Sequence, residues 1–207
     1  MICGLVLAAG AGSRFGREPK LLARVDGRPL LEHALAAQCG VVELQRVVVV
    51  LGANAARLRA GVRFGRAEPV LCENWADGIA ASLRCGVGVL PRAGKVIVTL
   101  GDEPLVSSAV IARFVGEPPG ARAVYRGRPG HPVVLGPAQL HALARLTGDQ
   151  GARELIRGGP EIECAELCAN RDVDTADDLE ALREELETVG RPEAAGPAKV
   201  GDRHHGP

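Results

Sequence analysis

The chain opens with an apolar run that passes directly into a glycine-rich loop, and this junction constrains the fold more than any other feature. Residues 2–8 are apolar, which is typical of a buried strand. The loop that follows has glycines at positions 10, 12 and 16, and Arg14 and Lys20 add positive charge to it. Glycine lets backbone N–H groups approach an anion closely, and the two cations can bind phosphate oxygens. The sequence therefore predicts a phosphate-binding loop for a nucleotide.

The spacing of this loop separates it from two common phosphate loops. A Walker A loop requires a hydroxyl directly after its lysine, but Lys20 is followed by Leu21. The dinucleotide pattern G-x-G-x-x-G is nearly met, but its third glycine, Gly16, comes one residue late. A dinucleotide site also needs an acidic residue near the end of the second strand, and residues 51–54 (L-G-A-N) supply none.

The composition bounds the class of protein. At 207 residues the chain is long enough for one domain, expected over residues 1–187, and the Gly-, Pro- and Ala-rich segment 188–207 is expected to be a disordered tail. The formal net charge is zero and 2% of the residues are aromatic, which argues against a nucleic-acid partner. Phosphate binding must therefore depend on a few placed cations and backbone N–H groups.

The cysteine pattern and the hydropathy bear on location. The six cysteines form no C-x-x-C pair, so neither a metal site nor a disulfide framework is indicated. No apolar run approaches the roughly 18 residues of a membrane span, and no basic segment precedes the N-terminal run. We therefore expect a cytoplasmic protein with buried thiols and no membrane partner.

Strand-like and helix-like segments alternate along the chain. Strands are predicted at 2–8, 46–51, 68–72, 95–100, 121–126, 132–135 and 161–166, and helices at 28–39, 54–60, 77–87, 107–115, 137–145, 150–157 and 175–187. Such alternation predicts an α/β fold, a three-layer α/β/α sandwich with a mostly parallel sheet. In this architecture ligands bind at the carboxyl ends of the strands.

Carboxylates lie at the ends of two predicted elements, after the strand at 95–100 and before the helix at 175–187. Asp102 comes just after the strand at 95–100, where it is well placed to bind Mg²⁺, which favours one or two carboxylates plus phosphate oxygens. Its neighbour Glu103 is a candidate for the outer shell of that site. Near the C-terminus, alternation in a short strand directs Asp172 and Asp174 to the same side, so either could complete the metal site, and we favour Asp174. Thr175 is expected to cap the last helix together with an aspartate three residues on.

Several segments in the same order resemble one family. They are L-A-A-G-A-G-S-R-F-G with the lysine at position 20, N-W-A-D-G-I-A-A-S-L-R (74–84), G-D-E-P (101–104), the pair G-R-P-G-H-P (127–132) and G-D-Q-G-A-R (148–153), and D-V-D-T-A-D-D-L (172–179). Together they resemble the MobA-like nucleotidyltransferases, most closely the molybdenum cofactor cytidylyltransferase group, over about residues 1–187. One departure is the lysine, which the family usually places one residue nearer the last glycine.

The resemblance implies a fold, a reaction and a site. The implied fold is the Rossmann-like sheet of nucleotide-diphospho-sugar transferases, and the implied reaction transfers CMP from CTP to the phosphate of molybdenum-bound molybdopterin, with Mg²⁺ as cofactor and pyrophosphate as product. A molybdoenzyme or its chaperone is the implied protein partner. The implied catalytic residues are Lys20, Arg14 and Asp102, the metal ligands are Asp102 and Asp174, the nucleotide-binding residues are Leu7, Ala8, Ala9, Gly10, Gly12, Ser13, Arg14, Lys20, Gly78 and Ser82, and the acceptor-binding residues are His131, Arg128 and Arg153.

Three other functions stay open at this point. The first is nucleotidyl transfer to another phosphate, such as a sugar phosphate or phospholactate, with GTP as an alternative donor. The second is an NAD(P)-dependent oxidoreductase that uses Gly10 and Gly12 as a dinucleotide loop. The third is a nucleotide-binding or chaperone-like module that binds CTP without releasing pyrophosphate.

Overall fold

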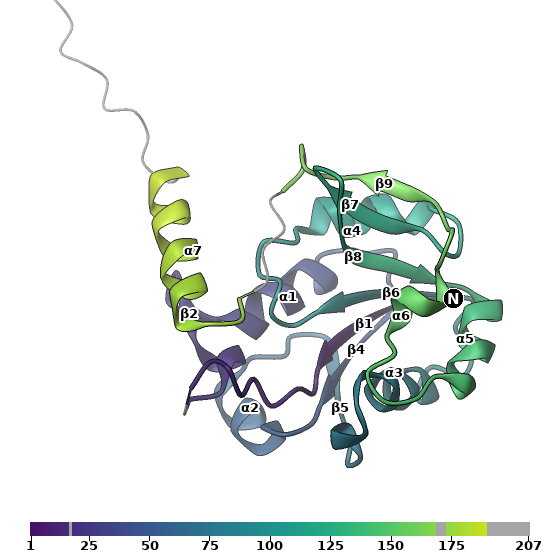
Figure 1. Cartoon of the computed structure of the whole chain (residues 1–207), viewed down its shortest axis with the longest axis horizontal. Coiled ribbons are helices and arrows are strands. Elements are labelled where there is room, and N and C mark those ends of the chain that lie inside the picture. The colour runs from purple at the N-terminus through teal and green to yellow at the C-terminus, as the bar shows by residue number, and fades with distance from the viewer. Residues whose placement is uncertain (17, 169–172, 190–207) are drawn as a thin grey trace, which may run out of the picture.

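One sheet organises the molecule (Figure 1). The structure is a computed structural model that describes residues 1–16, 18–168 and 173–189. Its seven-stranded sheet has the spatial order β5 (Ala67–Leu71), β4 (Arg46–Leu51), β1 (Ile2–Ala8), β6 (Lys95–Leu100), β8 (Arg128–Leu135), β7 (Arg122–Tyr125) and β9 (Glu161–Glu163). The β1 strand runs parallel to β4 and β6, whereas β8 is antiparallel to both of its neighbours. The expected mostly parallel sheet is therefore confirmed.

Alternating side chains along the central strands bury both faces of this sheet. In β4, Val47 and Val49 belong to one apolar core, whereas Val48 and Val50 belong to another on the opposite face. This division follows from the two-residue period of a strand, and it explains why these strands read as unbroken apolar runs in the sequence.

Helices cover the two faces and complete three layers, as expected (Figure 1). One face is covered by α1 (Leu30–Cys39), α2 (Ala55–Gly61) and α4 (Ser108–Gly116), and the other by α3 (Ile79–Gly88), α5 (Pro137–Ala142) and α6 (Ala152–Leu155). Short 3-10 helices occur at η1 (Lys20–Leu22), η2 (Trp75–Asp77) and η3 (Leu143–Arg145). In the part of the chain that the structure describes, no helix is long and apolar enough to cross a membrane.

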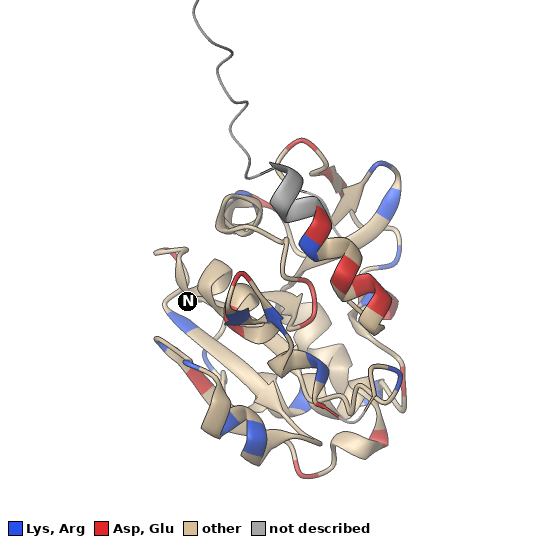
Figure 2. Cartoon of the chain, turned by 90° about the vertical axis from the view of Figure 1, so that its left-hand side faces the viewer, with Lys and Arg blue, Asp and Glu red and all other residues tan. Residues whose placement is uncertain are grey.

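A small subdomain at one side of the sheet was not predicted. A hairpin of β2 (Arg24–Val25) and β3 (Arg28–Pro29) turns at Asp26, which has a φ of 48°. The last helix, α7 (Ala176–Val189), packs on it through Leu179 and Leu182. Acidic residues gather along this helix in Figure 2. The hairpin strands are two residues long, so they show no period in the sequence.

The start of α7 matches its predicted cap. The Thr175 hydroxyl accepts from the Asp178 N–H at 3.1 Å, and Asp178 in turn accepts from the Thr175 N–H at 2.8 Å. This reciprocal arrangement satisfies N–H groups that would otherwise lack partners at the helix N-terminus. The helix extends to Val189, whereas Asp172 and residues 190–207 of the predicted tail lie outside the described residues.

Candidate active site

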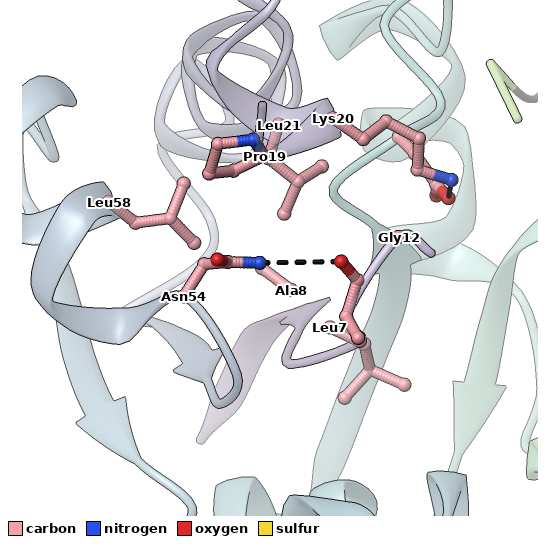
Figure 3. Close-up of a pocket in the computed structure, with 11 residues that line it drawn as sticks. Leu7, Ala8, Gly12, Pro19, Lys20, Leu21, Asn54 and Leu58 are labelled. Atoms are coloured by element: carbon pink, nitrogen blue, oxygen red, sulfur yellow. Dashed lines mark hydrogen bonds and ion pairs between the residues drawn. The ribbon is translucent and has the colours of Figure 1, made fainter. Parts of the chain in front are cut away.

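The glycine loop forms one wall of a pocket at the carboxyl edge of the sheet. Gly12 has a left-handed φ of 63°, and a Cβ there would lie 3.2 Å from the Cβ of Lys20, so this turn requires glycine. Figure 3 shows the pocket between the loop, η1 and α2, with Lys20 reaching past Gly12. The pocket has a volume of about 90 Å³ and is lined by Leu7, Ala8, Gly10, Ala11, Gly12, Pro19, Lys20, Leu21, Asn54, Leu58 and Asp102.

The Lys20 ammonium group joins two carboxylates that are distant in sequence. Its Nζ donates to Oδ2 of Asp102 at 2.6 Å and to Oδ1 of Asp174 at 3.0 Å. Arg14, at the solvent side, contacts the other oxygen of Asp174 at 3.0 Å. The structure thus brings together all four side chains for which the resemblance implies catalytic or metal-binding roles.

The environment keeps Lys20 charged. Burial of its side chain, which is 11% exposed, lowers the pKa of the amine, but the attraction of Asp102 and hydrogen bonds to both carboxylates outweigh this and raise the pKa above its usual value. A cation is therefore fixed beside the glycine loop. Removing it would leave two carboxylates close together without their shared counter-charge.

Backbone contacts explain why these carboxylates meet. The Gly101 N–H donates to the Leu7 carbonyl at 2.9 Å, which holds the end of β6 against the end of β1. The Val173 N–H then donates to the Asp102 carbonyl at 3.2 Å, which places the segment before α7 over the end of β6. The two acids consequently approach the loop from the middle of the chain and from its C-terminal part.

Asp102 and Asp174 fit a magnesium ion better than a metal that needs a full protein cage. The described residues contain no group of three or more His, Cys, Asp or Glu side chains able to hold a metal. Mg²⁺, however, is commonly bound by one or two carboxylates together with water and substrate phosphates. Two carboxylates that converge on one cationic group beside the glycine loop match that donor set.

The segment with Gly78 and Ser82 packs beside a second predicted motif. Gly78 has a φ of 97°, and a Cβ there would lie 2.4 Å from the Gly148 carbonyl oxygen. The same oxygen accepts from the Ala80 N–H at 3.1 Å. Ser82 is buried in α3, and neither it nor Gly78 is among the residues that line the pocket described above. Their nucleotide-binding role therefore stays a prediction.

The predicted acceptor-binding residues occupy different surroundings. The Nδ1–H of His131 donates to Oε1 of Glu103 at 2.9 Å, and the His131 carbonyl accepts from the Tyr125 hydroxyl at 2.6 Å. Arg153 contacts Glu154 on its own helix and is largely exposed, and Arg128 is exposed on β8. Of these three residues, His131 is therefore the one tied by a side-chain contact to the segment that carries Asp102.

Sequence reasoning missed the far wall of the pocket. Asn54 and Leu58 follow β4, and the Asn54 side-chain amide donates to the Ala11 carbonyl at 3.4 Å, as the dashed line in Figure 3 marks. The signal was present, because Asn54 lies just after a buried parallel strand, where such sheets place ligand-binding residues. From the sequence alone, Asn54 served only as evidence against a dinucleotide site.

The fold is an α/β sandwich whose pocket places acidic groups beside a glycine-rich loop. The family model of the MobA-like NTP transferase domain matches residues 4–166. Nicotine blue oxidoreductase of Paenarthrobacter nicotinovorans is 33% identical over 196 residues, which cover 87% of this chain and 96% of that protein. The chain therefore belongs to the MobA-like NTP transferase family, and its class is nucleotidyltransferase.

Other relatives extend the comparison. The crystal structure of Rv0371c of Mycobacterium tuberculosis H37Rv is 30% identical in sequence, and the match covers 88% of this chain and 97% of that one with a TM-score of 0.77. A structure of Rv0371c in complex with manganese matches with a TM-score of 0.75. The bifunctional protein GlmU of Kineococcus radiotolerans is 35% identical over 96% of this chain, which spans 40% of that longer protein. The similarity to Rv0371c supports the same fold for both chains.

Proposed function

We propose that this protein is a Mg²⁺-dependent cytidylyltransferase that transfers CMP from CTP to the phosphate of molybdenum-bound molybdopterin. The reaction would take place in the cytoplasm, as the cysteine pattern indicates, and its product would pass to a molybdoenzyme or its chaperone. The observation that carries the proposal is the contact of Lys20 with both Asp102 and Asp174 beside the glycine loop. The choice of CTP and molybdopterin rests on the resemblance of the sequence segments.

The reaction joins two anions, so charge is its main obstacle. An oxygen of the acceptor phosphate attacks the α-phosphorus of CTP, and the bond from that phosphorus to the bridging oxygen breaks, so that pyrophosphate leaves with the electron pair. The nucleophile is already ionised, and no general base is required. Positioning and neutralisation of charge therefore supply most of the catalysis.

Different residues of the site would bind the triphosphate, stabilise its negative charge and hold the metal ion. Backbone N–H groups of the glycine loop would hold the triphosphate, and Lys20 and Arg14 would stabilise negative charge on the reacting and departing phosphates. Mg²⁺ held by Asp102 and Asp174 would neutralise phosphate charge and polarise the phosphoryl oxygens. The manganese complex of the relative Rv0371c supports a divalent ion in this family.

A binding and turnover panel tests the proposal. The purified protein is heated with CTP, GTP, ATP or UTP, each with and without Mg²⁺, and pyrophosphate release is then measured with molybdenum-bound molybdopterin, a sugar phosphate or phospholactate. We expect stabilisation by CTP only when Mg²⁺ is present, and pyrophosphate with the molybdopterin acceptor. Release with another acceptor would redirect the substrate, and CTP binding with no release would indicate a non-catalytic module.

A second candidate is suggested by one relative. Nicotine blue oxidoreductase covers nearly the whole chain, and its name describes a redox reaction. The pocket offers Asn54 rather than an acid at the end of β4, which disfavours the ribose contact of a dinucleotide site. Stabilisation by NADPH without Mg²⁺, together with its oxidation in the presence of nicotine blue, would favour this candidate over nucleotidyl transfer.

A further inference from the structure

Glu103 is a buried acid that is only half paired. The residue is 2% exposed, and its Oε1 accepts from the His131 ring. Its Oε2 is buried and has no hydrogen-bond partner among the described residues. A buried carboxylate oxygen without a donor costs free energy, because it has lost water and gained nothing in exchange. Its stability contribution alone therefore does not explain why an acid occupies this position.

A second buried glutamate shows what a purely structural acid looks like in this chain. Glu32, on α1, is also buried, but its Oε1 accepts from the Arg63 backbone N–H at 3.0 Å and its Oε2 from the Arg63 guanidinium at 3.2 Å. Both of its oxygens are satisfied by one partner. Glu103 lacks this saturation, although it is the more deeply buried of the two.

The position of Glu103 links the two sides of the proposed site. It follows Asp102 at the end of β6, and Asp102 contacts Lys20 on the β1 side, where the glycine loop lies. On the other side of β6 lies the antiparallel strand β8, in which Val133 pairs with Val98, so that the start of β8 reaches the carboxyl end of β6. Adjacent acids on one turn thus contact opposite sides, Asp102 toward the loop and Glu103 toward His131.

His131 is held at two points by this arrangement. Glu103 accepts from its ring, and the Tyr125 hydroxyl donates to its carbonyl. A carboxylate acceptor at Nδ1 keeps the ring proton on that nitrogen and fixes the ring orientation. The side chain remains 23% exposed, so the ring is oriented without being sealed in the core. Fixing a group in advance lowers the entropy that a bound ligand must otherwise overcome.

We propose that Glu103 is a positioning residue that fixes the His131 ring in one tautomer and orientation on the side of the site that receives the acceptor phosphate. This inference rests on the proposed transfer to a phosphate acceptor. It accounts for a buried polar acceptor at this position, because Oε1 of Glu103 holds the His131 ring. It also gives the two acids of the turn separate tasks, one toward the nucleotide and one toward the acceptor.

Substitutions of equal length separate positioning from structure. Glu103→Met removes both the charge and the acceptor, whereas Glu103→Gln removes the charge but keeps an oxygen that can accept from the His131 ring. With molybdenum-bound molybdopterin as acceptor, we expect Glu103→Met to lower kcat/KM for the acceptor about tenfold or more, as for loss of a charge-assisted hydrogen bond, and to leave KM for CTP within about twofold. Glu103→Gln should recover most of the loss.

Stability supplies a second readout with Glu32→Gln as matched control. We expect Glu103→Gln to unfold at the same temperature as the parent protein or higher, because a neutral amide is easier to bury than a half-paired carboxylate. Glu32→Gln should unfold at a lower temperature, with unchanged kinetics. A Glu103→Gln variant that unfolds earlier and loses affinity for both substrates equally would overturn the proposal and indicate a structural acid.

A measurement on the ring itself does not depend on the acceptor. Long-range ¹H–¹⁵N NMR, assigned with the His131→Asn variant, reports which ring nitrogen carries the proton. We expect the Nδ1–H form in the parent protein and in Glu103→Gln, and a shift toward the Nε2–H form in Glu103→Met. An unchanged tautomer in Glu103→Met would refute the positioning role even if every acceptor in the turnover panel failed.

Discussion

Two clusters of charged side chains in this molecule differ in how completely their acidic groups are paired. On the flank of α1, a single acid, Glu32, lies between Arg63 and Arg28, with its oxygens accepting from Arg63. At the carboxyl edge of the sheet, Lys20 and Arg14 contact two acids, Asp102 and Asp174, and the neighbouring acid Glu103 contacts His131 on the other side of β6. We call this group of side chains the edge cluster. The first cluster is saturated and needs no ligand to explain it. The second keeps acidic groups beside the glycine loop, which is the arrangement that a cation and the proposed anionic substrate would complete.

The largest effects should come from the centre of the edge cluster. We expect Lys20→Ala and Asp102→Asn each to lower turnover about 10²–10³-fold, because in the proposed mechanism each removes a charge at the reacting phosphates. Steady-state pyrophosphate release measures this. Circular dichroism and the unfolding midpoint check that each variant is folded. Rates like those of the parent protein in either variant would mean that the reaction takes place elsewhere.

The same pair of variants can separate metal binding from phosphate binding. Asp102→Asn should weaken Mn²⁺ binding in the presence of CTP, measured from the electron paramagnetic resonance signal of free Mn²⁺, because one carboxylate ligand is lost. Lys20→Ala should instead weaken CTP binding, since the carboxylates remain while the cation beside the loop is gone. Equal Mn²⁺ affinity in Asp102→Asn and the parent protein would remove Asp102 from the metal site.

A smaller effect is expected at the rim of the edge cluster. Arg14 contacts Asp174 at 3.0 Å, but its side chain is 74% exposed, so solvent and salt screen its charge. We expect Arg14→Gln to lower turnover about tenfold at low ionic strength. The loss should be smaller in 0.5 M salt, where the Debye length is only about 4 Å. Turnover measured across a salt series tests this. A loss as large as that of Lys20→Ala at every salt concentration would contradict the rim assignment.

The comparison also shows what a sequence can reveal. The central strands were predictable because near-continuous apolar runs at 47–51 and 96–100 fit strands buried on both faces. The cap of α7 was predictable because Thr175 and Asp178 interact within one helical turn. Local patterns of this kind need no knowledge of tertiary structure.

The partners within the edge cluster could not be predicted in the same way. Lys20 lies 82 residues from Asp102 and 154 residues from Asp174, so their contact depends on the order of strands in the sheet. The inward direction of Glu103 likewise depends on β8 running antiparallel beside β6, which the sequence analysis did not specify. The residue types suggested chemistry at a strand end, and the topology decided which groups meet.

The smallest effect should come from the saturated cluster, and it should depend on pH. Burial alone would raise the pKa of Glu32, but hydrogen bonds from Arg63 and the charges of Arg63 and Arg28 outweigh it and lower the pKa below its ordinary value of 4.5. A lowered folded-state pKa means that the ionised acid stabilises the fold above pH 4.5, and that this contribution is lost as pH falls through the folded-state value.

Since Arg63 is largely exposed, we expect Glu32→Gln to cost only about 1 kcal/mol at pH 7. Urea unfolding of both proteins at pH 7 and pH 3 measures the difference, which should shrink at the lower pH while turnover at pH 7 stays unchanged. A difference that is constant with pH would show that packing, rather than the Arg63 contact, accounts for the contribution of Glu32.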